Sequence, residues 1–357
     1  MTQRNALVEM VRANLGIMIV IVLLGLILSF LSPIFLSPYN LRTVLLEITT
    51  NVYIASGMAL VMILGGIDLS VGSIVAMSGT LTVGFMALNH QPLWLAVIIG
   101  LSVGLAIGLI NGSIVTFFKI PSFIVTLAML NVARGIAYVY SGGRSTRMMD
   151  PAFTNIGSGY LWVFPLPVLY MFVLIALFVV LLNHTKFGTY IYAIGGNRES
   201  ARFSGVPIKK VEVITFAISG LLAAFAGIVL SARMFSGQPS VGVGYELDAI
   251  AACVLGGVSM SGGVGRISGT ICGAIVIGMV SNGLNLINVS SFWQLIVKGI
   301  IILIAVIIDS QKGNPNFFKG IFGGRGDKPF VPGNGASSKN GKAHEHHLTN
   351  RQSAFLS

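Results

Sequence analysis

Long apolar runs separated by short polar breaks dominate the chain, and they predict an all-α protein that crosses a membrane many times. A membrane-spanning helix needs roughly 20 mainly apolar residues. Runs of about this length are bounded here by prolines and glycine pairs, such as Pro33, Pro121 and Gly195–Gly196, which interrupt helices. The pattern predicts about ten spans, at 14–32, 46–64, 70–88, 93–117, 121–140, 161–183, 211–231, 246–262, 267–287 and 291–309.

The basic residues indicate the direction in which the spans cross. Ten spans place both termini on one side of the membrane. Sixteen of the 22 lysine and arginine residues lie on that side, in the N-terminus, the 118–120 turn, the loop 184–210, Arg266 and the C-terminal tail. Because short basic loops stay in the cytoplasm, we expect both termini inside and the 141–160 loop outside.

Composition supports a membrane protein and argues against other classes. The 357 residues are 54% apolar and 9% charged, whereas soluble domains carry about 25% charged residues. The net charge of +11 follows membrane sidedness, so we expect the lipid bilayer and no nucleic acid as a partner. The polar composition after residue 310 predicts a transmembrane domain, 1–310, followed by a disordered cytoplasmic tail, 311–357.

The loop 184–210 is the longest polar interruption between the apolar runs, and it contains a candidate short helix. The candidate residues are Glu199, Ser200, Ala201, Arg202, Phe203 and Gly205. A short helix with a small-residue face fits a groove of a soluble partner, with Phe203 as its apolar anchor and Gly205 as its C-terminal cap. An ordinary basic loop that only sets topology fits the same residues.

Polar residues in or beside the spans are candidates for a translocation path or its gate. They are Asp68, Ser70, Ser73, Glu246, Asp248, Asn282 and Asn285. Polar groups at membrane depth normally face a protein interior or a water-filled path. Helix capping is the alternative for the acids, and helix packing is the alternative for the two asparagines. The sequence leaves both interpretations open.

Two glycine clusters share the pattern GGxxxSxG. The first is GGIDLSVGS, residues 65–73, and the second is GGVSMSGGVG, residues 256–265. The first cluster is typical of an interrupted helix, which membrane proteins tolerate where the unwound backbone is buried or lines a cavity. The repeated pattern indicates either an internal duplication or two similar glycine-rich turns.

Three long motifs carry a resemblance to a known family. GGIDLSVGS at 65–73, IYAIGGNRESARFSGV at 191–206 and GYELDAIAACVLGGVSMSGGVGR at 244–266 resemble segments of permease subunits of ATP-binding-cassette importers of the ribose/galactoside type. The similarity covers nearly all of residues 15–310. The glutamate–small–alanine–three residues–glycine pattern of the loop resembles the coupling motif of these permeases, with Ser200 where alanine is frequent.

The resemblance implies a monosaccharide permease in the bacterial inner membrane, working as a homodimer with a path near the dimer axis. It also implies two partners: a periplasmic sugar-binding protein and a cytoplasmic ATP-binding subunit that docks on Glu199–Gly205. ATP and magnesium would bind to that subunit, so we expect no catalytic residues, cofactor or metal in this chain. The alternative is an ion-coupled secondary transporter with ion sites at Asp68 and Glu246. A membrane enzyme is disfavoured, because the spans contain no catalytic set.

Overall fold

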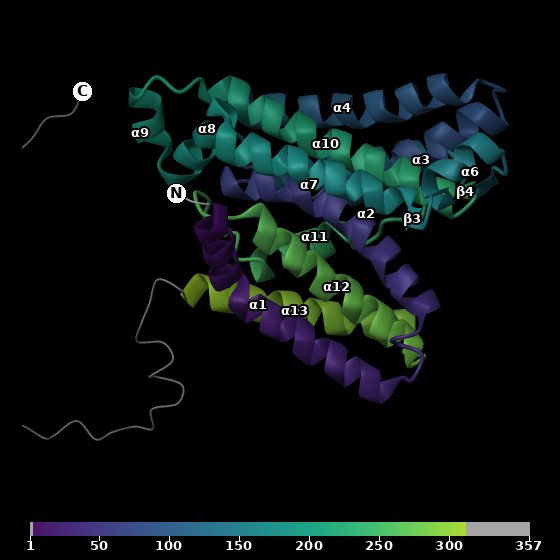
Figure 1. Ribbon diagram of the computed structural model, residues 1–357. Coiled ribbons are helices and arrows are strands. Elements are labelled where there is room, and N and C mark those ends of the chain that lie inside the picture. Colours follow the sequence, from purple (N-terminus) through teal and green to yellow (C-terminus); the bar gives the residue numbers. More distant parts are fainter. Residues whose placement is uncertain (1–2, 312–357) are drawn as a thin grey trace, which may run out of the picture. The chain divides into compact units, whose positions relative to one another are not determined.

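The computed structural model describes residues 3–311, and within them the chain forms thirteen helices and four two-residue strands (Figure 1). The helices are α1 Gln3–Leu31, α2 Pro38–Ile63, α3 Val71–Ala87, α4 Leu93–Phe118, α5 Ser122–Ser141, α6 Pro151–Ser158, α7 Leu166–His184, α8 Lys186–Gly196, α9 Arg198–Phe203, α10 Ile208–Arg233, α11 Tyr245–Leu255, α12 Ile267–Leu286 and α13 Ser291–Gln311. The strands are β1 Thr146–Arg147, β2 Tyr160–Leu161, β3 Phe164–Pro165 and β4 Ser236–Gly237. The tail predicted at 311–357 lies outside the described residues except for Gln311, the last residue of α13.

Seven of the described helices are long and apolar enough to cross a membrane: α1, α2, α4, α5, α7, α10 and α12. Helix α3 is apolar but has only 17 residues, and the apolar part of α13, Ser291–Ile307, is equally short. The chain is therefore a largely helical protein with several candidate spans, as its apolar runs predict. Length and composition alone identify seven candidate crossings among the described helices, three fewer than the ten that the sequence predicts.

The predicted span 246–262 is wrong in its second half, because α11 ends at Leu255. Gly257 has φ +81°, a left-handed conformation that favours glycine. The amide of Val258 donates to the carbonyl of Cys253 at 2.9 Å, and the amide of Gly257 donates to Val254 at 2.9 Å. This pair of bonds is the Schellman pattern that ends a helix. At 1.5 Å per residue, α11 covers about half of a bilayer core roughly 30 Å thick.

Helix α10 is the centre of one group of helices and packs on α4, α3 and α2. Its contact with α4 depends on small residues. A methyl group added to Gly220 would lie 3.0 Å from the Cα atom of Gly108, closer than side chains normally approach a backbone. Glycine therefore lets the two helix backbones come together, as is common between membrane helices.

Helix α12 organises a second group, since it contacts α11, α1 and α2, and α2 also packs on α10. Helix α2 thus belongs to both groups, and Figure 1 shows it running between them. At the end of the bundle where α2 begins, β1 pairs with β4 in antiparallel register, Thr146 opposite Gly237. Strands β2 and β3 form a second small hairpin before α7.

Candidate functional site

The loop 184–210 contains two helices, α8 and α9, separated by Asn197. Asn197 is in an extended conformation, with φ −157° and ψ 105°, and its side-chain oxygen accepts a hydrogen bond from the amide of Ser200 at 2.9 Å. Thr185 caps α8 in the same way by accepting from Gly188 at 3.2 Å. Side-chain oxygens at these positions satisfy amides that the first turn of a helix leaves free. Helix α9 is therefore a separately capped element.

Gly205 ends α9, which confirms the predicted role of this glycine as a helix cap. Its φ is +77°, and its amide donates to the carbonyl of Arg202 at 3.1 Å. The amide of Val206 donates to the carbonyl of Ala201 at 3.1 Å. These are the two hydrogen bonds of a Schellman motif, which requires a left-handed residue between them.

Helix α9 turns its polar residues and one aromatic ring outward. Glu199, Ser200 and Arg202 are exposed, and Phe203 is 85% exposed. Ala201 is buried, at 4% exposure, against the rest of the chain. Helix α9 therefore presents one uncovered apolar side chain among charged and small polar residues.

An ion pair that the sequence could not assign fastens α9 to α10. The guanidinium of Arg198 binds both carboxylate oxygens of Glu212, the second at 3.2 Å. The side chain of Glu212 is only 4% exposed, whereas that of Arg198 is 54% exposed. A buried carboxylate without a cation is costly, so this pair fixes the first residue of α9 on the second turn of α10.

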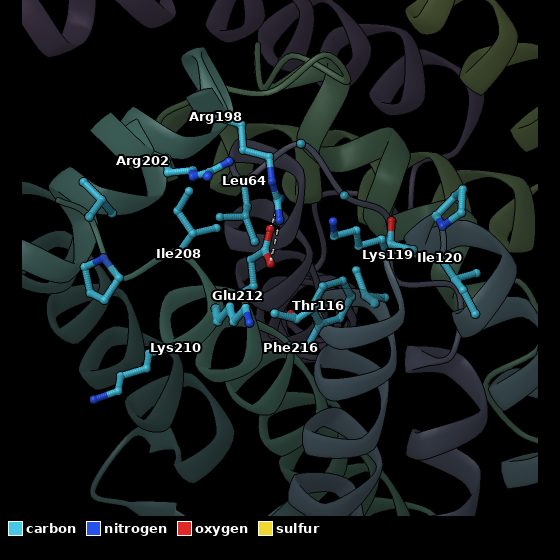
Figure 2. A pocket seen from close by; sticks show the side chains of 18 of the residues that line it. Leu64, Thr116, Lys119, Ile120, Arg198, Arg202, Ile208, Lys210, Glu212 and Phe216 are labelled. Atoms are coloured by element: carbon cyan, nitrogen blue, oxygen red, sulfur yellow. Dashed lines mark hydrogen bonds and ion pairs between the residues drawn. The ribbon is translucent and has the colours of Figure 1, made fainter. Parts of the chain in front are cut away.

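The ion pair forms one wall of a cavity of about 1030 Å³. Figure 2 shows Arg198 turned toward Glu212, with Lys119 across the cavity from Arg202. The rest of the lining comes from the α2–α3 turn at Leu64–Gly66, the end of α4, the start of α5 and the segment 206–210. Segments that the sequence places far apart therefore meet beside α9.

Helix α8 contacts the end of α2 and the α11–α12 loop through backbone atoms. The amide of Gly263 donates to the carbonyl of Ile63 at 2.8 Å. A methyl group on Gly195 would come within 2.5 Å of the Gly263 nitrogen and 3.0 Å of the Ile63 carbonyl carbon. The hydroxyl of Tyr192 donates to the carbonyl of Gly265 at 2.8 Å. Burial raises the pKa of Tyr192, so this hydroxyl keeps its proton at neutral pH. We call Gly195, Ile63 and Gly263 the backbone junction.

The unwound α2–α3 turn is held by side chains, and Asp68 is its centre. Asp68 is fully buried. One carboxylate oxygen accepts from the amide of Ser70 at 3.0 Å and from its hydroxyl at 2.6 Å, and the other accepts from the Ser219 hydroxyl at 2.8 Å. The amides of Ile67 and Leu69 donate to hydroxyls of α5, at 2.9 and 3.0 Å. Asp68 thus stabilises the approach to α3 rather than bonding the helix's own amides.

Glu246 and Ser73 each have a buried side-chain oxygen that no described group binds. Ser73 Oγ and one carboxylate oxygen of Glu246 are buried and have no hydrogen-bond partner among the described residues. The other oxygen of Glu246 accepts from the amide of Gly244 at 3.2 Å. Arg134 of α5 donates to the carbonyls of Pro239 and Val241 just before α11, the first at 2.8 Å.

The remaining candidates have protein partners. Asp248 forms an ion pair with Lys298 of α13 at 2.7 Å. Asn282 and Asn40 exchange two hydrogen bonds, at 2.9 and 3.0 Å, that join α12 to α2. Asn285 is exposed and accepts a hydrogen bond from Gln294 at 2.8 Å. Although Asn282 and Asn285 share a helix face in the sequence, the structure gives them separate surroundings.

The two glycine clusters both end a helix but differ in register. Gly65, the first glycine of its pair, has φ +94°, whereas Gly257 is the second of its pair. Ser70 precedes α3 directly, whereas Ser261 lies in a loop five residues before Arg266, the cap of α12. The shared pattern therefore describes similar helix ends, and it does not superpose residue for residue.

The sequence is similar to a protein family and to several individual permeases. Residues 40–306 match the family model described as "Branched-chain amino acid transport system / permease component". The ribose import permease protein RbsC of Bacillus subtilis (strain 168) is 44% identical over 304 residues, covering 85% of this chain and 94% of that protein. RbsC of Escherichia coli (strain K12) is 42% identical over 302 residues, covering 83% and 93%. The L-arabinose ABC transporter permease protein AraH of Azospirillum brasilense is 39% identical over 299 residues, covering 84% and 88%.

No solved structure matches the chain. The family match spans most of the sequence, and the relatives align over nearly their whole lengths. The chain therefore belongs to this permease family, as the resemblance to permease subunits of ribose-type ATP-binding-cassette importers predicts.

Proposed function

We propose that this permease carries a monosaccharide of the ribose, arabinose or galactoside class across the bacterial inner membrane, driven by ATP hydrolysis in a separate subunit. The names of the relatives, ribose and arabinose permeases, support the substrate class. The observation that carries the proposal is α9, a capped helix with an 85% exposed Phe203 that is held to α10 by an ion pair.

The cytoplasmic ATP-binding subunit docks on Glu199–Gly205, with Phe203 in an apolar groove and the charged residues around it. Phe203 is suited to this role because its large apolar side chain is exposed and would be buried in the groove. Because Arg198 fastens α9 to α10, a push on α9 moves the helix that packs on α4, α3 and α2. ATP and magnesium belong to that subunit, and this chain needs no cofactor of its own.

The orientation we propose has ten crossings with both termini in the cytoplasm. Lys119 and four basic residues of the 184–210 loop, Arg198, Arg202, Lys209 and Lys210, lie around one cavity, which agrees with their assignment to one side of the membrane. Helices α3 and α11 cross only together with the irregular segments that precede them. The tail 311–357 would then be cytoplasmic.

A second copy of the chain completes the path, and a periplasmic sugar-binding protein delivers the sugar at the outer face. Asn131, near the middle of α5, is exposed, with its amide bonded only to the carbonyl of Leu127 among the described residues. Exposed polar side chains at membrane depth need a protein or water neighbour. We place the path beside α5, where Glu246 and Ser73 each have a buried oxygen without a partner among residues 3–311. Asp68, Ser70, Asp248, Asn282 and Asn285 act by holding the surrounding helices.

The ion-coupled alternative assigns ion sites to Asp68 and Glu246, but both oxygens of Asp68 already accept hydrogen bonds from serine groups. The deciding experiment reconstitutes the permease with its ATP-binding subunit and binding protein in vesicles. We expect uptake of labelled ribose or arabinose that requires ATP and stops with vanadate. Uptake driven by an ion gradient without ATP would refute the importer.

A further inference from the structure

The cavity beside α9 holds more positive charge than its carboxylates neutralise. Its charged lining residues are Lys119, Arg198, Arg202, Lys209, Lys210, Glu199 and Glu212. Both carboxylates already have an arginine partner, since Glu212 binds Arg198 and Glu199 lies 3.7 Å from Arg202. Across the described part of the chain, none of the three lysines forms an ion pair. Three exposed cations around one hollow attract an anion.

Backbone groups in the same cavity favour an anion as well. Helices α5 and α10 both begin at its wall, after Pro121 and Pro207, and neither N-terminus has a side-chain cap. Uncapped amides and the helix dipole make such ends attractive to negative groups. The wall also contains Thr116, whose hydroxyl is buried and has no partner within residues 3–311.

We propose that this cavity binds the phosphate of an anionic phospholipid headgroup. The cavity of about 1030 Å³ has room for a glycerophosphate headgroup as well as for free phosphate, and the surface beside it favours the lipid. The surface next to the cavity is apolar: Phe117 and Phe118 at the end of α4 are 60% and 73% exposed, and Phe123 at the start of α5 is 51% exposed. Acyl chains can lie on these rings while the headgroup enters the cavity.

Basic pockets between membrane helices are known to hold anionic headgroups. The assignment to the cytoplasmic leaflet rests on the proposed orientation, but the binding itself does not. Because Arg202 of α9 lines the same cavity, a bound headgroup would also touch the element on which we place the ATP-binding subunit.

The test uses the full chain purified in detergent, with bound lipid counted by native mass spectrometry. Phosphatidylglycerol and phosphatidylcholine compete in one arm, and inorganic phosphate or glycerol 3-phosphate is added in the other. The variants are Lys119→Gln, the double variant Lys119→Gln/Lys209→Gln, and the control Lys186→Gln. Lys186 is exposed in the same loop but does not line the cavity, so it removes an equal charge.

We expect selective retention of phosphatidylglycerol, weakened about fivefold by each lysine removed and unchanged in the control. If the double variant folds poorly, the single variant still gives the comparison. If Lys186→Gln weakened the retention of phosphatidylglycerol equally, binding would depend only on the overall charge of the loop, and the site in the cavity would be refuted. Binding of soluble phosphate without lipid selectivity would overturn the lipid assignment. Unchanged retention of phosphatidylglycerol in the double variant would overturn the site as well.

Discussion

Replacing Gly195 by alanine tests whether the backbone junction transmits movement from the loop 184–210 into the membrane domain. The added methyl group would lie 2.5 Å from the Gly263 nitrogen and 3.0 Å from the Ile63 carbonyl carbon. The methyl group would also overlap the Ile63 carbonyl oxygen, which is nearer than either of these atoms. Ordinary contacts are about 3.4–4 Å, so the backbones must separate by more than 1 Å. Forcing an extra methyl group into a packed site costs about 1–3 kcal/mol, which corresponds to roughly a 5- to 150-fold change in an equilibrium.

The matched control is the neighbouring glycine. A methyl group on Gly196 meets no atom within 4 Å, and both glycines belong to α8, so alanine raises helix propensity equally in the two variants. In vesicles containing the complete complex, we expect Gly195→Ala to lower sugar uptake at least tenfold while ATP hydrolysis continues. Gly196→Ala should transport normally. Equal transport by the two variants would show that the junction carries no force.

Three further changes address α9 and the helix contacts. Gly205→Ala should destabilise the α9 cap by about 1 kcal/mol and reduce uptake, whereas Gly205→Asn, which tolerates φ +77°, should retain more activity; equal uptake would contradict the cap argument. Arg198→Ala leaves the buried carboxylate of Glu212 without a partner, so it should lower the free energy of unfolding by about 1–3 kcal/mol. Glu212→Gln removes that charge and should cost less in thermal unfolding; the reverse order would refute the pairing. Asn282→Leu should cost roughly 0.6–1.7 kcal/mol in thermal unfolding with transport retained, and a loss of transport at unchanged stability would instead place Asn282 on the path.

The apolar periodicity predicts most helices, because burial in lipid or protein requires long uniform runs. Its errors are at helix ends. Helix α2 begins at Pro38, eight residues before the predicted span, because Ser37 accepts a hydrogen bond from the Asn40 amide and the polar first turn hides the helix. Helix α11 stops early because left-handed Gly257 closes it. Such ends depend on single residues, which a hydropathy average does not detect.

The candidate site was predicted unevenly for a similar reason. Gly205 has one local function, and its cap follows from the sequence. The partners of Glu212 and Asp248 could not be predicted, because Arg198 and Lys298 come from other turns and helices. The sequence does not predict the backbone junction either, because close packing of glycines leaves no side-chain pattern. Contacts between distant segments are decided by packing, which requires the fold.

The brevity of α11 has a consequence for biogenesis. A segment that covers only about half of the hydrocarbon thickness and starts with Glu246 and Asp248 is a poor substrate for lateral release into lipid on its own. Its entry must wait for α13, whose Lys298 neutralises Asp248, and for α5, whose Arg134 holds the residues before it. Insertion of the C-terminal third is therefore cooperative, and a chain truncated before α13 should be recognised by quality-control proteases.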